Sequence, residues 1–301
     1  MIIPPEHNTW GSARGGGSGP EEASQQTDGS DFEVIVVDDG SDDEAPDGIR
    51  HRVDLLPLTI VRQPHTGIST ARNHGVRVSQ GTILLFVDAD CRLQPNCLAA
   101  LKSTIAALPT HNCFQLHLIG DRQGTVGRAE ELRLITLQNH LLQSNGCIRY
   151  LNTAGFAIRH THVDVERGLF NSSALRAEDT LLLANLIERG ELPFFVTTAI
   201  IEHHVPMSLL QCFRKDIRSA LLEGKTFDLI ASRGIRIRMS NRERLGLLRS
   251  MWKTSKQPEI GRSAWFALTA RQSLQRVTSL LYGLFRTRHN SRTADLSCGT
   301  R

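Results

Sequence analysis

The stretch TILLFVDADCRL, residues 82–93, places five consecutive apolar side chains, 83–87, directly before Asp88 and Asp90. An apolar run this short, bounded by glycine and polar residues, is typical of a buried strand in a mostly parallel sheet. In such sheets ligands bind beyond the carboxyl ends of the strands. The stretch therefore predicts an α/β fold and places two carboxylates at the edge of the sheet where ligands bind.

The segments around this stretch alternate between strand and helix patterns. We expect strands at 32–37, 58–61, 83–87, 152–159 and 193–204, and helices at 67–81, 95–107, 128–143 and 177–190. Ser69 or Thr70 can cap the first of these helices, and Gly81 closes it. Pro95 suits the first turn of the second helix. The alternation predicts a parallel sheet with right-handed crossovers.

Length and composition limit the class of protein. The chain has 301 residues, of which 40% are hydrophobic and 22% charged, and this composition indicates a globular chain of one large or two small domains. No apolar run approaches the roughly 20 residues of a membrane-spanning helix. The N-terminus also lacks the pattern of a signal peptide, so we expect a cytoplasmic protein. The six cysteines form no C-x-x-C pair, so we expect reduced thiols and no zinc site.

Charge is distributed unevenly along the chain. Residues 1–205 contain 16 Lys and Arg against 25 Asp and Glu, a net charge of −9, whereas residues 206–301 contain 19 against 6, a net charge of +13. A basic segment of this kind can bind nucleic acid, an anionic membrane or a diphosphate ligand. Only 5% of the residues are aromatic and the segment contains no nucleic-acid-binding motif, so we do not expect a nucleic-acid partner.

Aspartates follow two of the expected strands. Asp88 and Asp90 form a D-x-D pair whose oxygens suit Mg²⁺ or Mn²⁺, ions that keep several waters and bind substrate phosphates. Asp38 and Asp39, in VVDDGS, can accept hydrogen bonds from a base or a ribose. The structural alternative for both pairs is a solvated turn that ends a strand.

Three further groups of residues can take part in chemistry. Arg72 lies near the start of the helix at 67–81, where it and the backbone N–H groups can meet phosphate. Asp179, with Glu178 beside it, can serve as a general base, or the pair can simply favour a helix N-terminus. His203 and His204 end a strand and are either surface residues or ligands that complete a carboxylate metal site.

Three stretches stand in a characteristic order: FEVIVVDDGS, then VRQPHTGISTARNHGVRVSQGTILLFVDADC, then NTAGFAIRHTHVDVERGLFNSSALRAEDTLLLANLIERG. In this order they resemble family 2 glycosyltransferases of the GT-A fold, over about residues 31–215. The resemblance implies a Rossmann-like, mostly parallel sheet flanked by helices. It also implies a nucleotide-diphosphate sugar as donor, Mn²⁺ or Mg²⁺ as cofactor, and inversion at the anomeric carbon.

The resemblance assigns the donor side of the site residue by residue. Asp39, with Asp38 beside it, matches the aspartate that contacts the nucleotide. Arg72 matches the arginine of the family's A-R-N-x-G helix. Asp88 and Asp90 match the D-x-D that contacts the nucleotide sugar and binds the metal.

The same resemblance assigns the acceptor side and a further ligand. Asp179 of the E-D pair matches the catalytic base, with Glu178 as its neighbour. One of His203 and His204 falls where many GT-A enzymes have an additional metal ligand. Because inversion needs a single displacement, we expect no protein nucleophile.

The chain divides into three expected parts. Residues 1–30 are an atypical Gly/Ser-rich segment with a truncated first strand and helix, 31–205 are the GT-A nucleotide-sugar-binding and catalytic domain, and 206–301 are a basic helical extension. Glycine costs roughly 0.8–1 kcal/mol per helical position relative to alanine, so the Gly-rich stretch does not favour the helix that the family has there. A smaller departure is His65, where the family's Q-x-N-x-G pattern has asparagine.

The basic extension contains an amphipathic helix at 264–288, in which apolar residues recur at spacings of three or four and arginines lie between them. Two interpretations stand side by side. The helix lies on an anionic membrane surface, or it packs on the catalytic domain.

The sequence therefore predicts a metal-dependent inverting glycosyltransferase. Its expected acceptor is a carbohydrate or lipid-linked hydroxyl, in cell-surface polysaccharide or glycolipid synthesis, with the protein in the cytoplasm or peripheral on the cytoplasmic face of the membrane. The alternatives are a nucleotidyltransferase and a non-catalytic nucleotide-binding or membrane-associated remnant. Turnover of a nucleotide sugar distinguishes the three.

Overall fold

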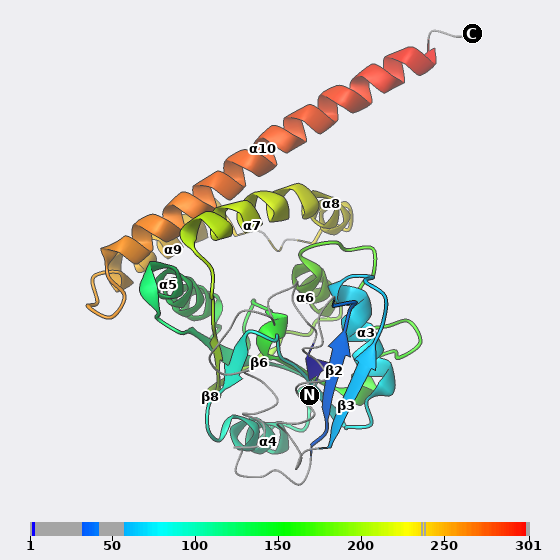
Figure 1. Cartoon of the computed structure of the whole chain (residues 1–301), viewed down its shortest axis with the longest axis vertical. Coiled ribbons are helices and arrows are strands. Elements are labelled where there is room, and N and C mark those ends of the chain that lie inside the picture. The colour runs from blue at the N-terminus through cyan, green and yellow to red at the C-terminus, as the bar shows by residue number, and fades with distance from the viewer. Residues whose placement is uncertain (1, 4–31, 42–56, 236, 238, 299–301) are drawn as a thin grey trace.

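A single mixed sheet runs through the centre of the computed structural model, which describes residues 2–3, 32–41, 57–235, 237 and 239–298 (Figure 1). Within these residues the eight strands lie in the order β3-β2-β1-β4-β7-β6-β8-β5. The strands are β1 Ile2–Ile3, β2 Val34–Asp38, β3 Leu58–Arg62, β4 Ile83–Phe86, β5 Cys91–Leu93, β6 Cys113–Gly120, β7 Phe156–Arg159 and β8 Phe194–His203.

The opening stretch forms β4, which lies in the middle of the sheet between β1 and β7. Its side chains alternate between two cores: Leu84 and Phe86 pack into one, and Leu85 and the following Val87 into the other. Both faces of the strand are therefore covered by apolar residues. This explains why the stretch is a continuous apolar run, and it confirms the predicted buried strand.

Strand direction is more varied than the alternation of strands and helices suggests. Parallel pairing joins β3, β2, β1 and β4 in turn, and also joins β6 with β8. In contrast, β7 is antiparallel to both β4 and β6, and β5 is antiparallel to β8. The amino ends of β5 and β7 therefore lie at the same edge of the sheet as the carboxyl ends of β4, β6 and β8.

Helices cover the sheet close to the expected positions. They are α3 Ile68–Val78, α4 Cys97–Ala107, α5 Gly124–Leu141 and α6 Glu178–Glu188. The segment expected as a strand at 152–159 divides into a short 3-10 turn, Thr153–Gly155, and then β7.

The expected helix caps are wrong in detail. Helix α3 begins after Gly67, whose φ of 98° places it in a region that favours glycine, and neither Ser69 nor Thr70 caps it. The helix ends at Ser79, before Gly81. Pro95 precedes the N-cap of α4, Asn96, and so lies outside the first turn.

The described part of the basic extension consists of helices joined by short turns. Its helices are α7 Leu209–Leu222, α8 Gly224–Ser232, α9 Asn241–Thr254 and α10 Arg262–Cys298. Ala264, Ala267 and Leu268 of α10 are buried in a cluster with residues of α5 and α9, so the start of α10 packs on the catalytic domain. Farther along, Val277 and Leu280 are exposed, and the helix runs past the body of the molecule (Figure 1).

Two other expectations concern the ends and the thiols. The short strand β1 lies between β2 and β4 and is parallel to both, whereas the Gly-rich stretch at 11–30 lies outside the described residues. The cysteines whose state the structure describes are buried free thiols: Cys91, Cys97, Cys113, Cys147 and Cys212. Among the described helices, none combines the length and apolarity needed to cross a bilayer.

Candidate active site

Three clusters of charged side chains lie along the edge where β2, β4 and β8 end. One contains Asp90 and His203, the second contains Asp88 with Arg72, and the third contains Asp39. The parallel course of β2 and β4 explains the shared edge, because parallel strands end on the same side of a sheet.

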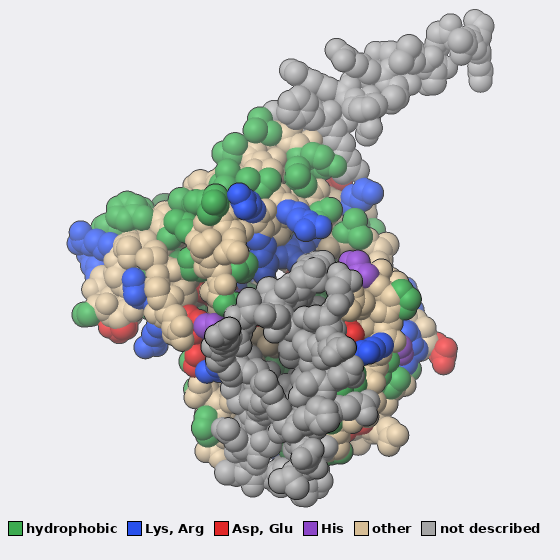
Figure 2. Space-filling model, in the orientation of Figure 1, with side chains coloured by type: hydrophobic (Ala, Val, Ile, Leu, Met, Phe, Trp, Pro, Cys, Tyr) green, Lys and Arg blue, Asp and Glu red, His purple; other side chains and the backbone are tan. Residues whose placement is uncertain are grey.

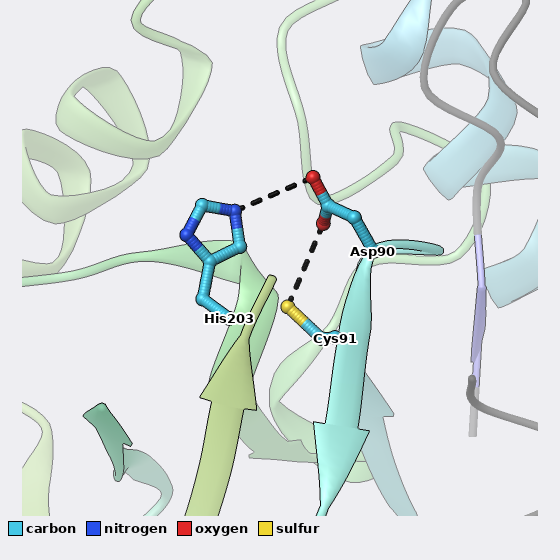
Figure 3. Close-up of side chains that lie close together, drawn as sticks. All are labelled: Asp90, Cys91 and His203. Atoms are coloured by element: carbon cyan, nitrogen blue, oxygen red, sulfur yellow. Dashed lines mark hydrogen bonds and ion pairs between the residues drawn. The ribbon is translucent and has the colours of Figure 1, made fainter. Parts of the chain in front are cut away.

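Asp90, Cys91 and His203 form the first cluster, drawn in Figure 3. Antiparallel pairing places Cys91 opposite His203, so the start of β5 and the end of β8 bring the three side chains together. His203 Nε2 lies 3.4 Å from Asp90 Oδ2, and Cys91 Sγ donates to Asp90 Oδ1 over 3.7 Å. One potential ligand atom from each residue lies within 4.8 Å of the others. This is the spacing that a single cation needs.

The ring nitrogen of His203 that does not face Asp90 has a partner of its own. Nδ1 lies 3.2 Å from Oε1 of Glu130, a buried residue of α5, and Arg133 Nε donates to the other oxygen of Glu130 over 2.9 Å. Burial opposes the charged imidazole, but Asp90 and Glu130 outweigh it and raise the pKa of His203 well above its usual value. Burial likewise opposes ionisation of Glu130, yet Arg133 and His203 hold its pKa well below the usual value. His203 is thus fixed between two carboxylates.

His204 takes a different direction. Its Nδ1 pairs with Asp121, a nearly fully buried residue that follows β6, while its backbone N–H donates to the Asp90 carbonyl oxygen over 2.8 Å. Successive side chains of a strand point to opposite sides, which explains why two adjacent histidines have different partners. Of the two predicted ligands, His203 lies beside Asp90.

Asp88 and Glu178 share a buried arginine. Arg72 Nη2 donates to Asp88 Oδ1 over 2.8 Å, and Nη1 donates to Glu178 Oε1 over 2.7 Å. The Arg72 side chain is 1% exposed, and its guanidinium carbon lies 5.4 Å from the centre of the Phe170 ring. Burial alone lowers the pKa of an arginine, but the two carboxylates raise that of Arg72 above its usual value. The loop after β4 is therefore tied to the start of α6.

Asp179 comes directly after Glu178 in the first turn of α6. Ala177, just before the helix, has a φ of 59°, which turns the chain sharply into α6. Burial, and then the charge of Glu178, raise the pKa of Asp179 to about 6. Its Oδ1 accepts the backbone N–H of Thr180 over 2.6 Å. A carboxylate with such a pKa is suited to accept a proton near neutral pH.

Asp39 holds the loop that leads into α3. Its two oxygens accept the backbone N–H groups of Thr66 and Gly67, each over 2.9 Å, and Oδ1 also accepts Gln63 Nε2 over 2.8 Å. Burial disfavours the charged form, but these hydrogen bonds outweigh it and lower the pKa of Asp39. His65 Nδ1 lies 3.0 Å from Oδ2, so the histidine that departs from the family pattern contacts this aspartate.

The neighbouring Asp38 has one contact within its own turn and one with strand β3. Its Oδ1 accepts the backbone N–H of Ser41 over 2.9 Å, and Arg62 Nε lies 3.4 Å from Oδ2. A nucleotide contact by Asp38 or Asp39 stays a prediction, as does a phosphate contact by Arg72.

Residues 21–163 match the family model described as glycosyl transferase family 2. The match covers just under half of the chain, and within it the sequence is similar to family 2 glycosyltransferases.

Curated proteins match the chain over shorter segments. Validoxylamine A glucosyltransferase of Streptomyces hygroscopicus subsp. limoneus is 41% identical over 87 residues, which cover 28% of this chain and 18% of that protein. Glycosyltransferase YibD of Escherichia coli K12 is 33% identical over 73 residues, which cover 24% of this chain and 21% of the relative. The matched segments thus span about a fifth of the length of these relatives.

Solved structures match the chain over most of its length. The mannosyltransferase PcManGT from Pyrobaculum calidifontis, in complex with GDP-Man and Mn²⁺, has a TM-score of 0.53 at 16% identity, covering 99% of this chain and 80% of that chain. Staphylococcus aureus TarS 1–349, in complex with UDP-GlcNAc, has a TM-score of 0.51 at 15% identity, covering 93% and 88%. At this identity the likeness shows the fold, which is the predicted GT-A fold.

Proposed function

We propose that the chain transfers a sugar from a nucleotide-diphosphate sugar to an acceptor hydroxyl, with the help of a divalent metal ion and with inversion at the anomeric carbon. The observation that carries the proposal is the pair of hydrogen bonds from Arg72. The guanidinium of Arg72 bridges Asp88 of the D-x-D and Glu178, and Asp179 is the next residue after Glu178 in the sequence. These contacts support a proposed donor-binding loop and a proposed general base at the same edge of the sheet.

The side chains of Asp90 and His203 suit a divalent cation. They offer one carboxylate oxygen and one imidazole nitrogen, and two protein ligands leave positions for water and for substrate phosphate oxygens. The imidazole favours a transition-metal ion such as Mn²⁺ over Mg²⁺. PcManGT, which shares the fold, was solved with Mn²⁺. A cation held there supplies positive charge for the departing diphosphate.

Residues around the cation site and the base have separate tasks in the proposed reaction. Asp179 accepts the proton of the acceptor hydroxyl. The hydroxyl oxygen then forms its bond to the anomeric carbon as the bond from that carbon to the diphosphate oxygen breaks, and the electron pair leaves with the nucleoside diphosphate. Arg72 keeps Asp88 and Glu178 in place during this step. A positioned general base typically contributes about 10²–10⁴-fold to the rate.

The acceptor class follows from the resemblance rather than from a contact in the structure. We propose a carbohydrate or lipid-linked hydroxyl, as in cell-surface polysaccharide or glycolipid synthesis, and a site of action in the cytoplasm or on the cytoplasmic face of the membrane.

The test measures release of nucleoside diphosphate from a panel of UDP and GDP sugars, with and without Mn²⁺. We expect Mn²⁺-dependent turnover of one donor in the wild-type chain, and loss of that turnover in Asp90→Ala and Asp179→Asn. Asp164→Asn, at an exposed aspartate remote in sequence from the site, is the matched control and keeps wild-type turnover.

Two results would contradict the proposal. Wild-type turnover in both site variants would remove the assigned residues from the reaction. Binding of nucleotide sugars without any turnover would instead favour the non-catalytic remnant, and turnover of a nucleoside triphosphate with release of pyrophosphate would favour a nucleotidyltransferase.

A further inference from the structure

One face of α7 exposes apolar and basic side chains together. Its apolar members are Leu210, Ile217 and Leu221, which are 59%, 37% and 41% exposed. Arg214 and Arg218 are exposed on the same face, because positions four, seven, eight and eleven residues apart lie close together around a helix. We call these five residues the α7 face. Hydrophobic and basic side chains lie next to one another where Figure 1 draws α7 and α10 (Figure 2).

Acidic charge is directed away from the α7 face. The acidic residue of α7, Asp216, binds Arg271 of α10 through two hydrogen bonds of 2.7 and 3.0 Å. Glu223, which follows the helix, lies 3.4 Å from Gln275 Nε2. Both acids turn toward α10, and among the described residues no ion pair is formed by Arg214 or Arg218, so the α7 face combines apolar surface with positive charge. This combination is complementary to a surface that is negatively charged and apolar beneath its charges.

The inner side of the same helix faces the candidate active site. The positive charge of Lys215, a partly buried residue of α7, acts on Asp90. Cys212, also on the inner side of α7, is fully buried. The helix also begins at Leu209, six residues after β8 ends at His203, so the α7 face belongs to an element that directly follows the strand carrying His203.

We propose that the α7 face lies on an anionic lipid surface and holds the active site beside it. Apolar side chains enter the boundary between headgroups and acyl chains, while Arg214 and Arg218 extend to lipid phosphates at the same level. The proposal rests on the proposed function for its meaning, since it brings a lipid-linked acceptor next to the site. The lipid contact itself requires no turnover, so it is testable separately.

The test is flotation of the full chain with vesicles of phosphatidylcholine, with or without phosphatidylglycerol, in the absence of any substrate. The variant Ile217→Gln/Arg218→Gln removes one apolar and one basic side chain from the α7 face. Its matched control is Val78→Gln/Arg77→Gln on α3. Val78 and Ile217 are almost equally exposed, at 36% and 37%, and each has an exposed arginine as its neighbour in the sequence. Circular dichroism and melting temperature establish that both variants fold.

We expect the wild-type chain to float with phosphatidylglycerol vesicles at low salt and to be released at high salt, which screens charge. The α7 variant should partition at least about fivefold more weakly, because one basic residue near an anionic surface contributes roughly 1 kcal/mol and the lost isoleucine adds to this. The α3 variant should partition like the wild type.

Several results would overturn the proposal. The wild-type chain could fail to float with phosphatidylglycerol vesicles, or the α7 and α3 variants could partition equally. A dimer in light scattering that the α7 variant dissociates would assign the α7 face to a second copy of the chain instead. Donor turnover is measured separately, on a water-soluble acceptor or on water. A wild-type chain that turns over the donor but does not bind the vesicles contradicts this inference alone. A wild-type chain that binds the vesicles but does not turn over any donor contradicts the proposed function alone.

Discussion

Replacing Asp179 with asparagine removes a charge that the folded chain disfavours. The carboxylate lies beside Glu178, and burial together with that neighbouring charge raises its pKa from 3.8 to about 6. A difference of about two pK units corresponds to roughly 3 kcal/mol of unfolding free energy. Asparagine keeps an oxygen that accepts the Thr180 N–H, so the variant should be more stable than the wild type by up to about 3 kcal/mol at neutral pH.

The gain should depend on pH in a defined direction. Below about pH 4 Asp179 is protonated in both the folded and the unfolded chain, so the substitution changes little. Between about pH 4 and pH 6 the folded chain keeps the proton that the unfolded chain loses, so the wild type loses stability as pH rises. Above about pH 6 the full difference is present. The advantage of Asp179→Asn therefore appears as pH rises through this window and stays constant above it.

Urea unfolding followed by circular dichroism, at neutral pH and near pH 4, measures the difference. Asp164→Asn is the matched control, because Asp164 is exposed and its Oδ1 also accepts a backbone N–H, that of Arg167, over 3.0 Å. It should change stability by less than about 0.5 kcal/mol. Nucleotide-sugar turnover by Asp179→Asn should fall about 10²–10⁴-fold. A variant that is less stable at neutral pH, or equally affected at both pH values, would refute the reasoning.

Two further substitutions test the contacts that hold the site. Arg72→Met should destabilise the chain by about 3–5 kcal/mol in urea unfolding, because it removes the guanidinium that the buried residues Asp88 and Glu178 share. A loss under 1 kcal/mol would show that the bridge is dispensable. Glu130→Gln should weaken Mn²⁺ binding about 10–100-fold, because it removes the carboxylate that orients His203. Calorimetry without nucleotide measures this affinity. An unchanged affinity in a folded variant would exclude the positioning role of Glu130.

The sequence was sufficient to predict the sheet edge at which the site lies. The apolar run of β4 and the aspartates after β2 and β4 are local features, and parallel strands bring their carboxyl ends to one edge. The structure confirms the two strands that precede these aspartates, β2 and β4, and the GT-A fold, whereas β6 was not predicted. It also places Arg72 and Asp179 at this edge through the contacts of Glu178, although their roles in binding and catalysis stay predictions.

Contacts between distant segments were beyond the reach of the sequence. Glu130 lies 73 residues from His203, and the only local signal for it is an acid at a buried position of the amphipathic helix α5. Cys91 joins the cluster because β5 pairs antiparallel with β8, and strand direction is not encoded in a three-residue strand. The predicted cap of α3 is wrong for a related reason. The segment that leads into the helix is fixed by Asp39, which lies 27 and 28 residues from Thr66 and Gly67, whose N–H groups it accepts.

The two histidines at the end of β8 give the most direct test of the central claim, which is that Asp90 and His203 hold the metal ion of a sugar-transfer site. The measurement is the Mn²⁺ affinity of His203→Ala and His204→Ala, with and without the nucleoside diphosphate of the accepted donor. The account predicts at least about tenfold weaker Mn²⁺ binding for His203→Ala and near wild-type binding for His204→Ala, whose imidazole pairs with Asp121. Equal affinities, or the greater loss in His204→Ala, would contradict it.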